Sequence, residues 1–131
     1  MRFGRTTGLG DLESAVMEHC WAAGESDAKG VHRAIGAPRA ITLNTIQSTL
    51  KRLHAKGLLA RRKVSHAHVY SPCRSREEFH RDVLGAIATE LAHREPTSML
   101  AAFVDLADRA GPETLEQLER LVAERLRRSR P

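Results

Sequence analysis

The chain has 131 residues, a formal net charge of +5, 41% hydrophobic residues and 28% charged residues. This composition excludes a disordered polymer, and no apolar run reaches the ~18 residues that a membrane-spanning helix needs. The length suits one domain, or a small domain with an appendage. Because Cys20 and Cys73 are too few for a disulfide framework and no apolar signal region opens the chain, we expect a cytoplasmic protein with free thiols.

The positive charge is concentrated in the first part of the chain. Residues 1–80 carry 13 Lys and Arg against 7 Asp and Glu, whereas residues 81–131 carry 8 against 9. The 48 residues from Lys29 to Arg76 include 11 basic side chains and no acidic one. Since an ordinary surface interleaves both signs, this stretch predicts a face that binds a polyanion such as a nucleic acid.

Two short helices are expected first. Asp11 is expected to cap a helix over 12–23, which has apolar residues on one face. A second helix is expected over 27–35, stopped by Gly36 and prevented from continuing by Pro38. Both precede the strongest helical pattern of this part of the chain.

That pattern predicts a third helix over 42–56. Its buried stripe consists of apolar side chains at 3-4-3 spacing, namely Leu43, Ile46, Leu50 and Leu53. Gly57 then closes the helix at its C-terminus. The face opposite the stripe carries short polar and basic side chains and no carboxylate, which favours contact with nucleic acid over an ordinary solvated face.

Two strands are expected over 58–64 and 67–71, joined by Ser65 and His66. Three consecutive basic residues lie on the first strand. Three helices followed by a basic hairpin are the order of a winged helix-turn-helix. We therefore predict a mostly α fold with a small β-hairpin wing, in which residues 9–74 form a winged-helix DNA-binding domain.

The remainder, over 75–128, predicts a helical module with little net charge. Ser75 and Glu78 form a capping box, and Pro96 and Pro112 separate the helices that follow. Three short amphipathic helices cannot close a sizeable core alone, so we expect a second copy of the chain to cover them. The residues assigned to this homodimer contact are Phe79, Val83, Ile87, Leu91, Met99, Phe103, Leu106, Leu115, Leu118 and Val122.

The candidate DNA contacts lie on the third helix and the hairpin. Asn pairs with adenine and Arg with guanine, while Ser and Thr suit thymine and phosphate. Lys51 and Arg52 lie further along the helix, so we expect them to hold phosphates rather than read bases. The full set is Asn44, Thr45, Gln47, Ser48, Lys51, Arg52, Arg61, Arg62, Lys63 and His66. The hairpin charges have a second interpretation, which is protection of an exposed edge strand from aggregation.

Other chemistry finds little support in the sequence. His66 and His68 are spaced to share one strand face, but a zinc site needs a third ligand and none has suitable spacing. The sequence contains no G-x-S-x-G, H-E-x-x-H, Walker loop or C-x-x-C motif. We therefore predict no enzymatic activity, no metal and no cofactor.

Short motifs distributed along the chain carry a family resemblance. They are Leu9-Gly10-Asp11-Leu12-Glu13, Arg52-Leu53-His54, Lys56-Gly57-Leu58-Leu59, Val69-Tyr70-Ser71-Pro72 and Ser75-Arg76-Glu77-Glu78-Phe79. Together they resemble the penicillinase repressor family over about residues 9–126. The resemblance implies a homodimeric winged-helix repressor on an inverted-repeat operator in double-stranded DNA, with the third helix in the major groove and the hairpin on the backbone.

The resemblance also implies a sensor protease as a partner. Family members that control antibiotic resistance are inactivated by cleavage of an Asn-Phe bond in the dimer module, and Ala102-Phe103 stands at the matching position here. Copper-responsive members end in a cysteine cluster, whereas this chain ends in LRRSRP. The resemblance thus supports an operator-binding repressor more strongly than either route of induction.

Two other hypotheses stay open from the residues alone. A winged helix can bind an acidic protein instead of DNA, because a fold does not determine a function. A repressor could also respond to metal or oxidant through Cys20, Cys73 and the hairpin histidines. Sequence-specific DNA binding separates the first hypothesis from a repressor, and sensitivity to chelator or oxidant tests the second.

Overall fold

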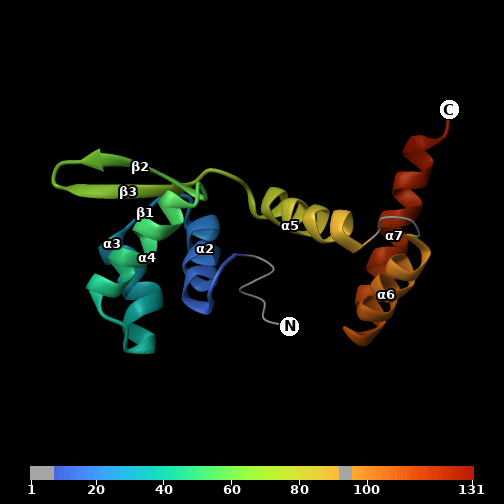
Figure 1. Ribbon diagram of the computed structural model, residues 1–131, viewed down its shortest axis with the longest axis horizontal. Coiled ribbons are helices and arrows are strands. Elements are labelled where there is room, and N and C mark those ends of the chain that lie inside the picture. The colour runs from blue at the N-terminus through green and yellow to red at the C-terminus, as the bar shows by residue number, and fades with distance from the viewer. Residues whose placement is uncertain (1–7, 92–95) are drawn as a thin grey trace. The chain divides into compact units, whose positions relative to one another are not determined.

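The computed structural model describes residues 8–91 and 96–131 and divides into two compact units (Figure 1). Unit 1 ends at Gly85 and unit 2 begins at Ala86. The fold is mostly helical with a small antiparallel sheet, which confirms the predicted fold class. Within the described ranges, no helix is long and apolar enough to cross a membrane.

Unit 1 has the element order of a winged helix, followed by the start of a longer helix. Its elements are α2 (Asp11–Ala23), β1 (Ser26–Asp27), α3 (Ala28–Val31), the π-helical turn η1 (His32–Gly36), the 3-10 turn η2 (Ala37–Arg39), α4 (Leu43–Ala55), β2 (Leu59–Val64), β3 (Ala67–Pro72) and α5 (Arg76–Leu91). The strands pair in the order β1-β3-β2, both pairs antiparallel. The third helix and the hairpin therefore form where the sequence predicts them.

Helix α2 begins differently from the prediction. Its N-cap is Gly10, whose backbone N–H donates to the Glu13 carboxylate at 3.1 Å. Asp11 lies in the first turn, where its negative charge favours the N-terminal end of the helix dipole. The prediction that Asp11 caps this helix was wrong, because Glu13 reaches back to the backbone donor that a capping residue would otherwise satisfy.

The helix predicted over 27–35 is only partly regular. Asp27 does cap α3, accepting a hydrogen bond from the Gly30 N–H at 2.8 Å. After Val31 the turns widen into η1 and then tighten into η2. Pro38 does not stop the helical turns, since it lies in the first turn of η2, where a backbone donor is not needed.

Gly36 is required for space rather than for helix termination. A Cβ atom there would lie 2.7 Å from His32 Cδ2 and 3.0 Å from Ile46 Cγ1. Real Cβ atoms do not approach other atoms at 2.7 Å, so a side chain at position 36 would displace the His32 ring within η1, and it would also crowd Ile46 of α4. The prediction that Gly36 ends the helix was wrong, because helical turns continue from η1 through Gly36 into η2.

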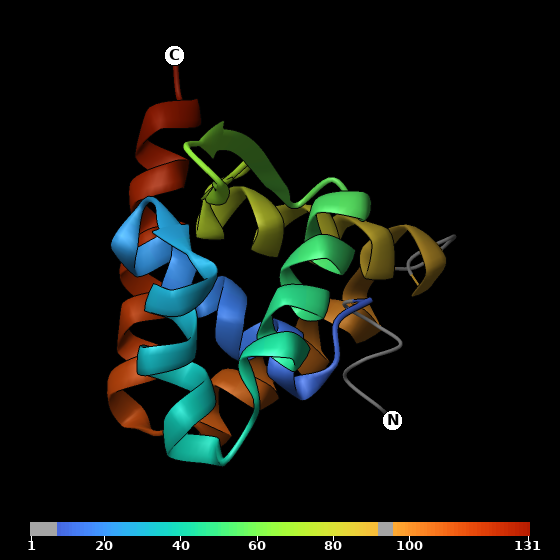
Figure 2. The same ribbon diagram turned by 90° about the vertical axis from the view of Figure 1, so that its left-hand side faces the viewer.

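An aliphatic core holds unit 1 together beneath α4. The predicted stripe is confirmed at Ile46, Leu50 and Leu53, which are fully buried, whereas Leu43 is half-buried. Helix α4 contacts α2, as the turned view in Figure 2 also shows. The remaining core residues come from the other elements and are Leu9, Val16, Met17, Cys20, Val31, Leu59 and Tyr70. This burial determines which face of α4 meets solvent.

The start of α5 packs on α2. The predicted capping box is confirmed, because the Glu78 N–H donates to Ser75 Oγ at 3.0 Å and the Ser75 N–H donates to the Glu78 carboxylate at 3.1 Å. The Trp21 indole donates to the Arg74 carbonyl at 2.8 Å, and its ring lies 5.4 Å from that of Phe79. Phe79, assigned from sequence to the dimer contact, is thus half-buried within unit 1.

Unit 2 contains the end of α5, helix α6 (Pro96–Arg109) and helix α7 (Pro112–Ser129). Helices α6 and α7 contact each other, yet no residue of either is buried. Leu91 belongs to α5, but its side chain lies outside the described residues. Large apolar side chains of α6 and α7 that remain exposed are Leu100, Phe103, Val104, Leu106, Leu121, Val122 and Leu126.

An ion pair connects the start of α2 to the end of α4. Lys56 Nζ lies 2.9 Å from a Glu13 carboxylate oxygen and donates to the Gly8 carbonyl at 2.6 Å. Burial raises the pKa of Glu13, but hydrogen bonds from Lys56 and the Gly10 N–H, with the nearby positive charges, outweigh it. The pKa of Glu13 therefore lies below its ordinary value of 4.5.

We expect Glu13→Gln to lower the free energy of unfolding by about 0.5–1 kcal/mol at neutral pH. A carboxyl with a lowered pKa in the folded state adds stability above its ordinary pKa, and this stability is lost as pH falls through the folded pKa. Urea unfolding of wild type and variant should thus give curves that converge below the ordinary value of 4.5. A stability difference that persists unchanged in acid would contradict this role, and Asp105→Asn at an exposed position of α6 provides a control.

Candidate nucleic-acid interface

The polar face of α4 is presented to solvent. The helix begins at the Thr42 N-cap, whose side-chain oxygen accepts a hydrogen bond from the Thr45 N–H at 3.2 Å. The buried stripe turns the opposite face outward. All the α4 residues assigned to DNA from sequence are exposed, and they are Asn44, Thr45, Gln47, Ser48, Lys51 and Arg52.

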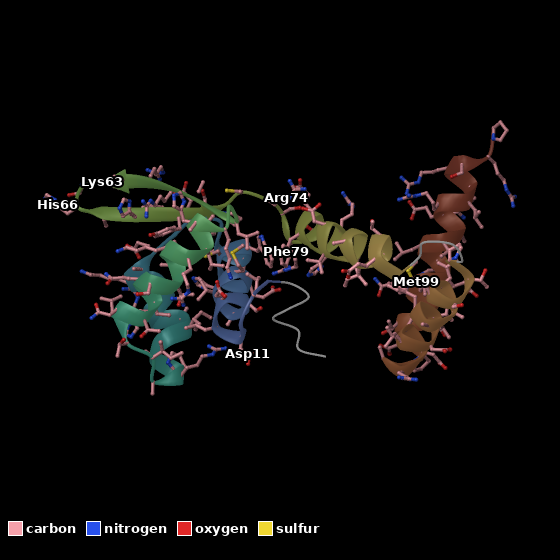
Figure 3. The ribbon with its side chains drawn as sticks, in the orientation of Figure 1. Asp11, Lys63, His66, Arg74, Phe79 and Met99 are labelled. Carbon is pink, nitrogen blue, oxygen red and sulfur yellow. The ribbon has the colours of Figure 1, made fainter. Side chains whose placement is uncertain are left out.

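The hairpin of β2 and β3, here called the wing, projects as a narrow ribbon (Figure 1). Its two-residue turn places Ser65 at a φ of 57°, in the left-handed region that tight hairpin turns use. Lys63 and His66 lie near its free end, whereas Arg74 and Phe79 lie beyond its other end (Figure 3). The wing therefore carries Lys63 near its free end (Figure 3).

The wing has two faces with different surroundings. Arg61 pairs with Tyr70 and Lys63 with His68 across the two strands. Side chains of directly opposed residues point to the same face, so Arg61 and Lys63 share the face of the buried Tyr70. Arg62 points to the other face, where it lies 2.8 Å from the Glu25 carboxylate.

A groove of about 630 Å³ separates α4 from the wing. Its polar lining includes Lys29 from α3, Gln47 and Lys51 from α4, and Ser65, His66, His68 and Tyr70 from the wing. The Asp27 carboxylate, which caps α3, lines the groove as well. Sequence reasoning missed Lys29 as a member of this site, and it left His68, another wing histidine, out of the set of DNA contacts. Lys29 lies beside the wing because the two-residue strand β1 pairs with β3. A strand of only two residues cannot be predicted from a sequence pattern.

The structure divides the 11 basic residues between Lys29 and Arg76 into two groups. Four form ion pairs with acids from outside that stretch, namely Lys56 with Glu13, Arg62 with Glu25, Arg74 with Asp82 and Arg76 with Glu18. The others form no ion pair with any described residue, and they are Lys29, Arg33, Arg39, Lys51, Arg52, Arg61 and Lys63. The uncompensated charge thus lies on the segment from α3 to η2, on α4 and on the wing.

The cysteines and histidines do not assemble a second site. Burial raises the pKa of the Cys20 thiol to about 11, so it stays protonated at neutral pH. Cys73 is exposed. In the part of the chain that the structure describes, no group of three or more His, Cys, Asp or Glu residues is arranged to hold a metal ion.

These features define a winged-helix DNA-binding protein. They are a helix with an exposed, acid-free face, a projecting hairpin, and cations without acidic partners around the helix and the hairpin. Solved structures with a similar fold include the transcriptional regulator Tm0710 from Thermotoga maritima, with a TM-score of 0.51 and 19% identity over 98% of this chain and 84% of that one. Another is overoxidized AbfR bound to DNA, with a TM-score of 0.51 and 15% identity over 82% of this chain and 76% of that one. At these identities the likeness shows the fold alone.

Sequence comparison identifies the family. The penicillinase repressor model matches residues 9–124. The transcriptional regulator BlaI of Mycobacterium tuberculosis is 36% identical over 122 residues, which cover 92% of this chain and 86% of BlaI. The chain therefore belongs to the penicillinase repressor family, as the motifs predicted, and it is a DNA-binding transcriptional repressor rather than an enzyme.

We expect Lys63→Ala to weaken DNA binding more than Arg62→Ala does. Lys63 lies on the groove face of the wing without an acidic partner, whereas Arg62 already pairs with Glu25. Each lost phosphate contact reduces the slope of log affinity against log salt by about 1, so Lys63→Ala should do so and Arg62→Ala should not. Fluorescence anisotropy with one duplex at several salt concentrations measures both slopes, and equal slopes would contradict the assignment.

Proposed function

We propose that this protein is a homodimeric repressor of an inverted-repeat operator. Helix α4 enters the major groove of each half-site, and the wing lies on the adjacent backbone. The observation that carries this proposal is the exposed, acid-free face of α4 bordered by cations that lack acidic partners. An operator-binding role also places its site of action in the cytoplasm.

The groove between α4 and the wing suits a phosphate backbone. Lys29 and Lys51 line it and outnumber the one carboxylate, Asp27, in the lining. Lys63 does not line the groove, but it lies opposite the lining residue His68 on the same face of the wing. Phosphate contacts of this kind set the position of a protein on the duplex, while base contacts specify the sequence. The cations around the groove therefore hold the backbone while α4 meets the bases.

Unit 2 supports the homodimer. A second groove, of about 610 Å³, follows the α6–α7 pair. Its large apolar lining residues are Val104, Leu115, Leu118, Val122 and Leu126, and Glu116 and Glu119 also line it. Contiguous exposed apolar side chains mark an interaction surface, and burying them against the same surface of a second copy produces a two-fold symmetric pair. Two-fold symmetry matches an inverted repeat whose half-sites are one helical turn, or a multiple of it, apart.

A sensor protease, the partner that the family resemblance implies, would cut within this surface. Ala102 and Phe103 lie within α6, and both are exposed. A protease that cut between them would break a helix of the proposed dimer interface. Cleavage would therefore act on operator binding through loss of the dimer rather than through the winged helix itself.

Gel shift on the protein's own promoter tests the proposal. We expect tight binding to one inverted repeat, preference over a scrambled duplex, and a steep negative slope of log affinity against log salt. Binding without any sequence preference would refute the operator proposal. Binding to an acidic protein with no preference for operator DNA would favour the adaptor hypothesis instead.

We expect Val122→Glu to convert the dimer into a monomer and to reduce operator affinity at low protein concentration. A carboxylate placed in the apolar groove of unit 2 would have to lose its hydration on association, which is costly without a partner. Analytical ultracentrifugation measures the mass. Gln117→Glu adds the same charge to α7 at an exposed position outside the groove lining, so it should remain dimeric; a monomeric wild type would overturn the dimer.

A further inference from the structure

We propose that the two ends of α4 have different roles in DNA binding. The uncharged first turns of the helix recognise an A·T pair, and its later residues bind phosphate. Asn44 is the residue that we assign to the adenine of this pair. This inference rests on the proposed function, since it requires α4 to lie in the major groove. It adds the class of base pair and the residue that selects it.

Charge is distributed unevenly along α4. The segment from Thr42 to Leu50 contains no charged residue, and the cations begin at Lys51 and Arg52. In a helix-turn-helix protein, the N-terminal residues of the recognition helix contact the base edges. The part of α4 that meets the bases therefore carries only hydroxyl and amide groups among its polar side chains.

The contacts of these side chains separate them further. The hydroxyl of Thr45 lies 3.0 Å from that of Thr42 in a hydrogen bond, so Thr45 has its methyl group left for a thymine methyl. Arg52 donates to Thr49 Oγ1 at 3.1 Å, which holds the guanidinium against the helix. Asn44 is exposed, and its amide has no hydrogen-bond partner among the described residues.

The amide of Asn44 matches adenine and not guanine. Adenine presents an acceptor at N7 and a donor at N6 in the major groove, whereas guanine presents two acceptors, N7 and O6. An amide has one acceptor oxygen and an NH₂ donor, so it satisfies both groups of adenine at once. Guanine calls for two donors from one side chain, and the first turns of α4 contain no Arg or Lys.

Gln47 carries the same amide but has a different position. It lines the groove together with Lys51 and the wing histidines, which is the side where we place the phosphate backbone. Asn44 does not line that groove and lies on the face opposite the buried stripe. Gln47 therefore serves as the matched control on the same helix, since its loss should weaken binding equally on all sequences.

The first experiment uses the full-length wild-type protein. A random duplex pool is selected for binding, and each adenine of the enriched half-site is then replaced by 7-deaza-adenine, which lacks the N7 acceptor. We expect one adenine in each half-site at which this replacement lowers affinity roughly 2- to 10-fold, because one of the two hydrogen bonds to the Asn44 amide is lost while the bond to N6 remains. An enriched site that tolerates the replacement at every adenine would overturn the assignment.

The second experiment uses variants of the exposed Asn44, which are expected to fold because the side chain is not part of the core. Asn44→Ala should bind the unmodified and the 7-deaza duplex equally, while Gln47→Ala should keep the full penalty. Asn44→Arg should shift the selected base at this position from adenine to guanine. Retention of the penalty by Asn44→Ala would refute the pairing of Asn44 with this base.

The outcomes also separate this inference from the function on which it depends. If no sequence is enriched from the pool, the operator proposal fails and the assignment of Asn44 fails with it. If a sequence is enriched but neither the modified base nor the Asn44 variants change its recognition, the repressor proposal stands and only the adenine contact is lost. The first result thus rejects both claims, whereas the second rejects only the adenine contact.

Discussion

Burial of one stripe of α4 is the constraint on which the rest of unit 1 depends. Ile46, Leu50 and Leu53 are fully buried, and each such side chain contributes about 1.5–3 kcal/mol relative to exposure. Their burial leaves α4 no freedom to rotate, so the polar face must point outward. Gly36 permits the close approach of η1 that completes this packing. The orientation of the proposed DNA-binding face is thus a consequence of the core behind it.

The acid-free stretch of the sequence is not free of acidic partners in the structure. Composition alone indicates one continuous basic footprint, but Glu13, Glu18 and Glu25 reach into it from the first helix and the loop after it. These pairs connect distant segments, and such partners cannot be identified from local sequence. They remove several cations from the surface available to phosphate and leave the unpaired ones around α4 and the wing.

Periodic patterns made most of unit 1 predictable. The stripe of α4, the glycine after it and the capping box of Ser75 and Glu78 are local signals, and each is confirmed. The contribution of Lys29 to the groove was not predictable, because it depends on pairing between β1 and a strand more than 40 residues later. The assignments of individual residues to DNA remain predictions, since exposure alone does not reveal a ligand.

The specificity that a repressor needs for its operator explains why the proposed role of α4 requires the proposed dimer. One uncharged helical face offers few base contacts, and each good bidentate pair discriminates by only about 1–3 kcal/mol. Specific DNA binding exceeds non-specific binding by about 4–10 kcal/mol, which a single such face does not reach. Two copies of α4 on an inverted repeat double the base contacts, and the exposed apolar surface of α6 and α7 supplies the means of joining them. A weakly discriminating helix and a helical unit without a core of its own are therefore complementary features of the proposed symmetric dimer.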